Sequence, residues 1–275
     1  MPGITRRTLF GLGGAAAAGA ALGGRARAEA CPDADSRAPF VLVPGAWHGG
    51  WCWRKLTPLL RKAGHPVHAP SLTGMGDRSA ALGKHVNLDT HIDDVAQLLE
   101  FEDLRGVILV GHSYGGMVIT GAAERAAERI ARLVFLDADV PADGQSSLDP
   151  DPEPKRKRLE ARARKLGDGW LLPPASPESM GVTDPADARW VKARLRPIPL
   201  ACFTQPVKNT RARALPHTYI LCTATPRSWG THAVARRVKA EGGWDLREVK
   251  AGHDAMLAAP EALARELLAA AALGT

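Results

Sequence analysis

Residues 111–115 read Gly-His-Ser-Tyr-Gly and place a serine where it could act as a nucleophile. An apolar run at 107–110 precedes this motif and a helix-like run at 117–123 follows it, which predicts a strand, a tight turn and a helix. The flanking glycines permit a strained turn that would expose the Ser113 hydroxyl above a sheet. The start of the helix would direct free N–H groups and its positive dipole end to the same place. The pattern favours acyl transfer through Ser113.

A serine nucleophile needs a general base, and one histidine late in the chain has a suitable position. Residues 244–249 form the last predicted strand, and the loop after it reads Ala-Gly-His-Asp-Ala-Met at 251–256. A loop histidine is usually a surface residue, but a place directly after the final strand favours catalysis. His253 is therefore the predicted base.

Two backbone N–H groups are predicted to bind the oxyanion. One belongs to Tyr114, the residue after the nucleophile, and the other to Ala46 in the loop after the first core strand. That loop reads Pro-Gly-Ala-Trp-His-Gly-Gly-Trp at 44–51. The alternative for this glycine-rich segment is a plain turn.

The acid that would orient His253 is not at its usual place, because the loop 223–230 after the predicted strand 217–222 contains no carboxylate. Asp245 begins the strand that leads to His253, so eight extended residues place it roughly 26 Å away. Asp254 would need a contorted loop to reach the Nδ1 of its neighbour.

Asp137 is the favoured acid. It ends the predicted strand 133–136 at the edge where Ser113 would emerge, and it keeps the chain order Ser, Asp, His. Asp139 points the same way along an extended chain and is the reserve. The third alternative is a Ser–His dyad helped by water or backbone, with Asp137 in a structural role such as capping a turn.

The elements that must position these residues alternate between strands and helices. Strands are expected at 40–43, 67–69, 107–110, 133–136, 217–222 and 244–249, and helices at 53–63, 91–101, 117–123, 233–240 and 261–271. This alternation predicts the α/β class, with a mostly parallel sheet covered by helices on both faces.

The rhythm breaks between residues 141 and 210, a stretch rich in proline and charge with helical spacing at 159–166 and 186–195. We expect a cap insertion at 141–210 between two core segments, 39–140 and 211–275. The basic run 155–158 is expected to be a solvated helix face, with a membrane or acidic-substrate patch as the alternative.

The N-terminal segment indicates export. Residues 5–10 form a twin-arginine pattern, followed by a Gly/Ala-rich stretch at 11–24 and small-x-small cleavage sites before Cys31. We expect a twin-arginine signal at 1–28, a linker at 29–38, and a periplasmic or secreted protein that uses the twin-arginine export machinery. The stretch is too short and glycine-rich for a stable membrane anchor, although lipidation of Cys31 and a disordered alanine-rich tail are alternatives.

The formal charge of +7 comes largely from this segment, which holds four of the 36 Lys and Arg and none of the 29 acids. The balance is no argument for nucleic acid. The four cysteines have no metal-binding spacing, so no metal or cofactor is predicted. Buried free thiols are expected, and a disulfide between some pair is the alternative.

Four segments, at 40–51, 72–77, 111–118 and 252–256, together resemble one branch of the α/β-hydrolases, which contains bacterial esterases, plant methylesterases and hydroxynitrile lyases. The resemblance extends over nearly all of 39–270. It implies an α/β-hydrolase fold with a helical cap, Ser113 and His253 as the catalytic pair, and an oxyanion hole from Ala46 and Tyr114.

Three positions depart from parts of that branch. The lyases have a lysine where this chain has Asp254 and a threonine where it has Ala46, and both differences favour ester hydrolysis over cyanohydrin cleavage. The family usually has an aspartate in the loop that lacks one here, which leaves the third catalytic member open.

The resulting hypothesis is a cofactor-free serine carboxylesterase acting on a small ester of an apolar or aromatic acid. Residues that could contact the substrate are Trp47, His48, Met117, Trp170, Trp190 and Met256. For each of these a core or loop-bracing role is the alternative. The rival functions are a lyase or C–C bond hydrolase on the same fold, and a non-catalytic module that binds a small molecule.

Overall fold

A computed structural model describes residues 37–149 and 153–274. Its centre is a six-stranded sheet in which every neighbouring pair is parallel, in the order β2-β1-β3-β4-β7-β8. The strands are β1 (Phe40–Val43), β2 (Val67–His68), β3 (Val107–His112), β4 (Ile130–Leu136), β7 (His217–Cys222) and β8 (Trp244–Val249). The predicted α/β class with a mostly parallel sheet is confirmed.

Side chains along each strand alternate between two cores, one on each face of the sheet. In β1, Phe40 and Leu42 belong to one core, whereas Val41 and Val43 belong to the other. This is the two-residue period of a strand. Both faces are therefore apolar, and helices must cover both of them.

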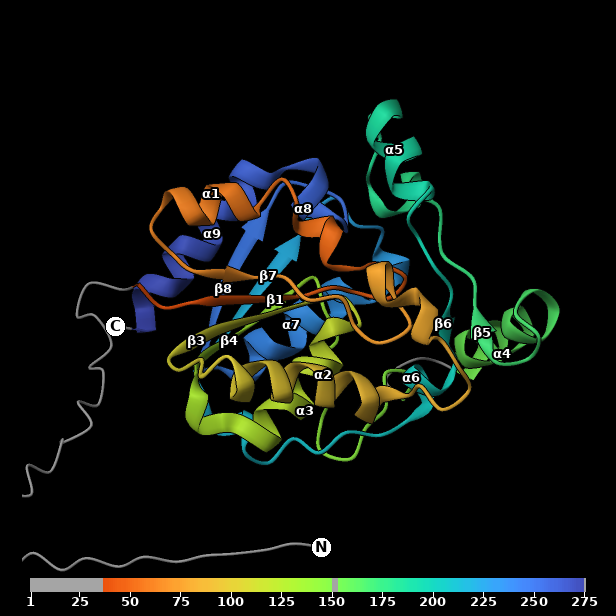
Figure 1. Cartoon of the computed structure of the whole chain (residues 1–275), viewed down its shortest axis with the longest axis horizontal. Helices are drawn as coiled ribbons and strands as arrows, with labels where there is room; N and C mark the ends of the chain where they lie inside the picture. The colour runs from red at the N-terminus through yellow and green to blue at the C-terminus, as the bar shows by residue number, and fades with distance from the viewer. Residues whose placement is uncertain (1–36, 150–152, 275) are drawn as a thin grey trace, which may run out of the picture. The chain divides into compact units, whose positions relative to one another are not determined.

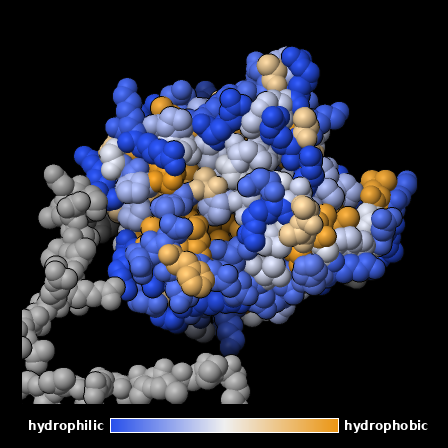
Figure 2. All heavy atoms as spheres, in the orientation of Figure 1, coloured by the Kyte–Doolittle hydropathy of each residue, from blue (hydrophilic) through white to orange (hydrophobic). Residues whose placement is uncertain are grey.

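Helices cover each face of the sheet, as Figure 1 shows. The face of Val41 packs against α2 (Leu88–Phe101), α3 (Gly115–Ala126) and α7 (Thr231–Glu241). The face of Phe40 packs against α1 (Thr57–Lys62), α8 (Ala255–Ala258) and α9 (Pro260–Ala271). On the surface seen in Figure 2, polar residues predominate and apolar residues form small separate groups.

The predicted helix at 53–63 is wrong at its start. A 3₁₀-helix, η1 (Gly50–Trp53), comes first, and α1 begins only at Thr57. Pro58 lies in the first turn of α1, where its missing N–H has no intrahelical role, so the helix starts there. Other 3₁₀ segments are η2 (Gly76–Ala81), η3 (Ala127–Arg129), η6 (Arg227–Trp229) and η7 (Ala272–Gly274).

Between β4 and β7 the chain leaves the sheet and builds a separate set of short elements. They are α4 (Glu153–Leu166), β5 (Leu171–Leu172), η4 (Glu178–Met180), α5 (Pro185–Lys192), β6 (Ile198–Pro199), α6 (Ala201–Thr204) and η5 (Ala212–Ala214). Strands β5 and β6 pair antiparallel. In Figure 1, α4, α5 and this strand pair lie to the right of the sheet. We call the segment from 141 to 210 the cap.

Cys52, Cys202 and Cys222 are buried free thiols, as expected. The predicted export signal at 1–28, Cys31 and most of the linker at 29–38 lie outside the described residues. In the part of the chain that the structure describes, no helix is both long and apolar enough to cross a membrane.

Candidate active site

Ser113 occupies a strained turn between β3 and α3. Its φ of 53° lies in the left-handed region, which is costly for a residue with a side chain. The turn is tight because a Cβ on Gly111 would lie 2.5 Å from the carbonyl oxygen of Gly115, so only glycine fits there. The backbone of Ser113 is held by hydrogen bonds on both sides, from its N–H to Leu136 and to its carbonyl from Asp139.

His253 and Asp137 meet beside this turn. Nδ1 of His253 lies 2.7 Å from Oδ2 of Asp137, and both side chains are buried. Since a carboxylate only accepts, Nδ1 carries the hydrogen and donates it. Asp137 follows β4 directly and has a φ of 44°, a second strained residue at the same sheet edge. The structure thus brings together Asp137 and His253, the two residues that the sequence placed around Ser113.

The loop after β7 supplies donors for Asp137. The N–H of Cys222 donates to Oδ1 at 3.1 Å, and the hydroxyl of Thr225 donates to Oδ2 at 2.8 Å. Burial opposes the ionised form, but the hydrogen bond and charge of His253 and these two donors outweigh it and lower the pKa of Asp137. The carboxylate therefore stays ionised. Thr225 is not among the residues predicted from the sequence. The available signal was its position in the loop 223–230, where the catalytic acid is usually found but no carboxylate is present.

The other carboxylates considered as the acid have different partners. Oδ2 of Asp139 accepts from the Ser147 hydroxyl at 2.6 Å. Asp245 lies on β8 outside the site, where it accepts from Thr218 of β7 and from Arg247. Oδ2 of Asp254 lies 3.1 Å from Nε2 of His48. Asp137 is thus the carboxylate hydrogen-bonded to Nδ1 of His253.

The loop after β1 lies against Ser113. A Cβ on Gly45 would be 2.9 Å from Cβ of Ser113, so glycine allows the close approach of this loop. Ala46 follows directly and is buried. Among the described residues, neither the N–H of Ala46 nor that of Tyr114 donates a hydrogen bond to another protein group. Both donors remain available for an oxyanion.

Tyr114 is fixed from behind by a histidine of α2. Nε2 of His91 lies 2.9 Å from the carbonyl oxygen of Thr73, so it donates, and Nδ1 then accepts from the Tyr114 hydroxyl at 3.0 Å. Burial lowers the pKa of His91 to about 4, which keeps the ring neutral, as this arrangement requires. The ring of Phe203 in the cap lies 5.2 Å from that of Tyr114.

Trp47 connects the oxyanion loop to the cap. Its indole N–H donates to the carbonyl oxygen of Leu172 at 3.1 Å, and its own carbonyl oxygen accepts from the N–H of Arg196 at 3.0 Å. Its φ of 70° is a third strained backbone position at the site. The predicted substrate residue therefore also anchors β5 of the cap.

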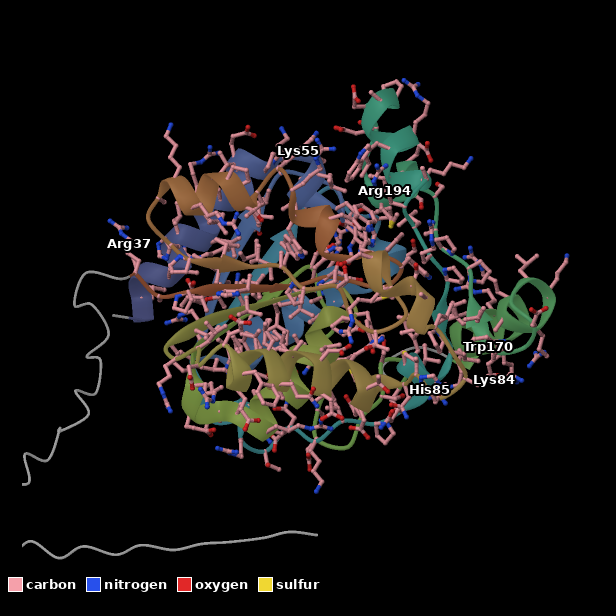
Figure 3. All side chains as sticks on the ribbon, viewed as in Figure 1. Arg37, Lys55, Lys84, His85, Trp170 and Arg194 are labelled. Atoms are coloured by element: carbon pink, nitrogen blue, oxygen red, sulfur yellow. The ribbon has the colours of Figure 1, made fainter. Side chains whose placement is uncertain are left out.

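Cap helix α5 is held to the core by charged and aromatic side chains. The guanidinium groups of Arg54 and Arg194 lie over the ring of Trp190, 4.5 and 4.1 Å from its centre. The ammonium of Lys55 donates to Asp187 at 2.5 Å. Figure 3 shows Lys55 beside α1 and Arg194 at the base of α5. Trp190 thus connects the cap to the core, and its predicted contact with the substrate stays a prediction.

The other predicted substrate residues have varied surroundings. His48 is buried, and both ring nitrogens contact protein groups, an arrangement that fits its alternative loop-bracing role. Met117 and Met256 are fully buried, in different cores. Trp170 precedes β5, at the right of Figure 3 beside α4. Substrate contact by these last three stays a prediction.

Within residues 37–149 and 153–274, no three His, Cys, Asp or Glu side chains are grouped so that they could hold a metal ion. The model of the alpha/beta hydrolase family matches residues 40–266, which include Ser113, Asp137 and His253.

The chain belongs to the alpha/beta hydrolase family.

Relatives place this alpha/beta hydrolase among the esterase-type members. A carbendazim hydrolyzing esterase of Nocardioides sp. (strain SG-4G) is 41% identical over 243 residues, which cover 84% of this chain and 99% of that protein. The salicylic acid-binding protein 2 of Nicotiana tabacum is 47% identical over 106 residues, 37% of this chain and 40% of that protein.

A solved structure supports the same family. It is an extracellular alpha/beta-hydrolase from a Paenibacillus species, described as sharing structural and functional homology with the tobacco protein. It superposes with a TM-score of 0.74 at 27% identity, covering 85% of this chain and 98% of its own. The predicted α/β-hydrolase fold and the resemblance to the esterase branch are confirmed.

Proposed function

We propose that this protein is a serine carboxylesterase that hydrolyses a small ester through Ser113, His253 and Asp137. The observation that carries the proposal is the 2.7 Å hydrogen bond from His253 Nδ1 to Asp137 Oδ2, next to the strained turn of Ser113. The esterase names of the relatives support it.

In the first half-reaction the Ser113 hydroxyl attacks the ester carbonyl carbon. Nε2 of His253, on the side of the ring away from Asp137, takes the hydroxyl proton as the C–O bond forms. The negative oxygen of the tetrahedral intermediate accepts hydrogen bonds from the N–H groups of Ala46 and Tyr114. His253 then returns the proton to the alcohol, which leaves as the acyl-enzyme forms.

In the second half-reaction water replaces the alcohol. His253 removes a proton from the water, whose oxygen attacks the acyl carbon, and then protonates Ser113 as the acid departs. Asp137 stays ionised because three donors hold its carboxylate, so its charge stabilises the imidazolium that forms twice in each cycle. No cofactor is part of this sequence of steps.

The proposed substrate is a small ester of an apolar or aromatic acid. The cap lies over the oxyanion loop through Trp47 and would enclose the acyl or alcohol group. The Nocardioides relative is named for carbendazim hydrolysis, so carbendazim belongs in the substrate panel.

The experiment that tests the proposal is hydrolysis of a panel of short p-nitrophenyl esters and carbendazim, with Ser113→Ala as the matched variant. We expect turnover by the wild-type protein and its loss in Ser113→Ala. Labelling of Ser113 by a fluorophosphonate gives an independent check of the nucleophile. A folded wild-type protein that is inert on every ester would contradict the proposal.

Two further assays of the same protein test the remaining hypotheses, a lyase and a non-catalytic binding module. Release of cyanide from a cyanohydrin would favour the lyase, although Asp254 is buried against His48 instead of facing a substrate. Binding of esters without turnover or labelling would favour the non-catalytic module.

We further propose that residues 1–28 direct the protein through the twin-arginine machinery to the periplasm or the medium. The support is the Arg6-Arg7 pair, the apolar stretch after it and the small residues before position 31. Fractionation of cells that express the full chain and the double variant Arg6→Lys, Arg7→Lys tests this. Export that persists in the variant would contradict this route.

A further inference from the structure

Asp254 is a buried carboxylate next to the proposed catalytic base, yet the proposed mechanism does not use it. Its side chain is 0% exposed and Oδ2 lies 3.1 Å from Nε2 of His48. His48 belongs to the oxyanion loop, and Asp254 belongs to the loop that carries His253. The contact therefore joins the two halves of the proposed site across 206 positions of the sequence.

The ring of His48 lies between two acceptors. Nδ1 is 2.8 Å from the carbonyl oxygen of Ala46, which cannot donate, so Nδ1 carries a hydrogen. Nε2 faces the Asp254 carboxyl group. A hydrogen bond there needs a second proton, either on His48, which gives an imidazolium and a carboxylate, or on Asp254, which gives a neutral pair.

The electrostatics favour the charged pair. Burial disfavours the imidazolium of His48, but the adjacent Asp254 carboxylate outweighs burial and raises the pKa of His48. Burial also disfavours the carboxylate of Asp254, and the charge and hydrogen bond of His48 outweigh this and lower the pKa of Asp254. Each partner thus stabilises the ionised form of the other.

The neighbouring titratable groups leave this charge assignment intact. His112 lies 3.8 Å from Asp254 Oδ1, but its Nε2 donates to the carbonyl oxygen of His253 at 3.0 Å, and burial lowers the pKa of His112 to about 3. Burial raises the pKa of the Cys52 and Cys222 thiols far above neutral, so both stay uncharged. The fourth group that faces Asp254 is His253 itself.

Each end of the pair is tied to a proposed catalytic group. His48 holds the carbonyl oxygen of Ala46, whose own N–H is a proposed oxyanion donor. Asp254 is bonded in sequence to His253, and its N–H donates to the carbonyl oxygen of Met180 in the cap at 2.8 Å. A displacement of either loop would therefore change the distance between oxyanion donor and base.

We propose that the His48–Asp254 ion pair is a positioning element that holds the oxyanion loop against the His253 loop, and that loss of the Nε2 proton of His48 at alkaline pH releases it. The inference rests on the proposed esterase function. Without that proton, two acceptors face each other at 3.1 Å and repel. Because oxyanion donors act mainly in the transition state, kcat falls while KM changes little.

The test is the pH dependence of kcat and KM for a p-nitrophenyl ester in four proteins: wild type, Asp254→Asn, Asp254→Ala and the control Asp245→Asn. In Asp254→Asn the amide N–H can donate to neutral His48, which restores the hydrogen bond without charge. We expect the wild-type kcat to fall at alkaline pH with the loss of one proton. The asparagine variant is not expected to show this decrease at alkaline pH, and its kcat at neutral pH is expected to be within roughly fivefold of the wild-type value.

The alanine variant separates positioning from folding. It leaves Nε2 of His48 without a partner, so kcat is expected to drop on the order of tenfold or more at every pH, with KM within about threefold. Asp245→Asn removes a partly buried carboxylate outside the site and should keep the wild-type profile. A thermal unfolding curve of each protein shows whether a variant is already unfolded at the assay temperature.

An NMR titration of the histidine rings keeps this inference separate from the esterase proposal. His48→Gln identifies the His48 signals, which are expected to titrate with a pKa above the usual value for a histidine side chain. A neutral His48 at pH 7, or an alkaline fall that persists unchanged in Asp254→Asn, would overturn the positioning role while leaving the esterase intact. An imidazolium in a protein inert on all esters would instead overturn the esterase function, and with it the role of the pair in catalysis.

Discussion

Oδ2 of Asp137 and Nδ1 of His253 lie 2.7 Å apart although 116 positions separate them in the sequence. Asp137 directly follows β4 and His253 comes after β8, with β7 between these two strands. The contact forms because all of these strands run parallel and end at one edge of the sheet. The same edge carries Ser113 at the end of β3.

Replacement of Asp137 by asparagine is expected to lower kcat about 10³–10⁴-fold, because the amide cannot hold His253 in the tautomer that accepts the serine proton. The measurement is kcat on a p-nitrophenyl ester. Asp139→Asn is the matched control: its carboxylate binds Ser147, so the loss should be far smaller. Equal losses of kcat in the two variants would contradict the assignment of Asp137 as the acid that orients His253.

Thr225→Val is expected to reduce kcat about tenfold to a hundredfold, because a hydrogen bond to a charged group contributes roughly 1.5–3 kcal/mol. The change removes the hydroxyl that donates to Asp137 and leaves a similar volume. Thr225→Ser should restore most of the activity. In the neighbouring control Thr223→Val, the lost hydroxyl donates to the Val249 carbonyl oxygen and not to Asp137, so an equal effect there would count against a specific role for Thr225.

Gly111→Ala is expected to destabilise the protein by about 1–3 kcal/mol and to abolish activity, because its Cβ would overlap the Gly115 backbone. Urea unfolding and ester hydrolysis measure the two effects. Gly144→Ala is a control in open space, where only the positive φ opposes alanine. A Gly111→Ala enzyme with wild-type activity would show that the turn tolerates a side chain.

Acidification is expected to destabilise the fold partly through His91. Its pKa is about 4 in the folded protein and about 6.5 in the unfolded chain. The unfolded state therefore binds the extra proton first as pH falls, and stability present above pH 6.5 is lost down to about pH 4. The loss from this residue is on the order of 3 kcal/mol.

Urea unfolding of wild type and His91→Gln at pH 7 and pH 4.5 measures this contribution. The glutamine variant should lose less stability on acidification, although it is less stable at pH 7. His85→Gln, on the surface, should behave as wild type. An equal loss of stability between pH 7 and pH 4.5 in all three proteins would show that groups other than His91 cause the acid destabilisation.

Most strands and helices could be predicted because their signals are local. The apolar runs of β1 and β3 and the glycines around Ser113 are readable from neighbouring residues, since side-chain period and turn sterics act over a few positions. The motif spacing also carried the family resemblance. The start of α1 was misplaced because a 3₁₀ turn and an α-helix share nearly the same apolar pattern.

By itself, the sequence determined the parallel α/β architecture and the candidates Ser113 and His253, and it ranked Asp137 above Asp139. Only the tertiary structure decided which carboxylate contacts His253, that Thr225 and the Cys222 N–H hold it, and that His48 faces Asp254 instead of solvent. These contacts join residues from different strands and loops. Their distances depend on the order and register of the sheet, which no local pattern encodes.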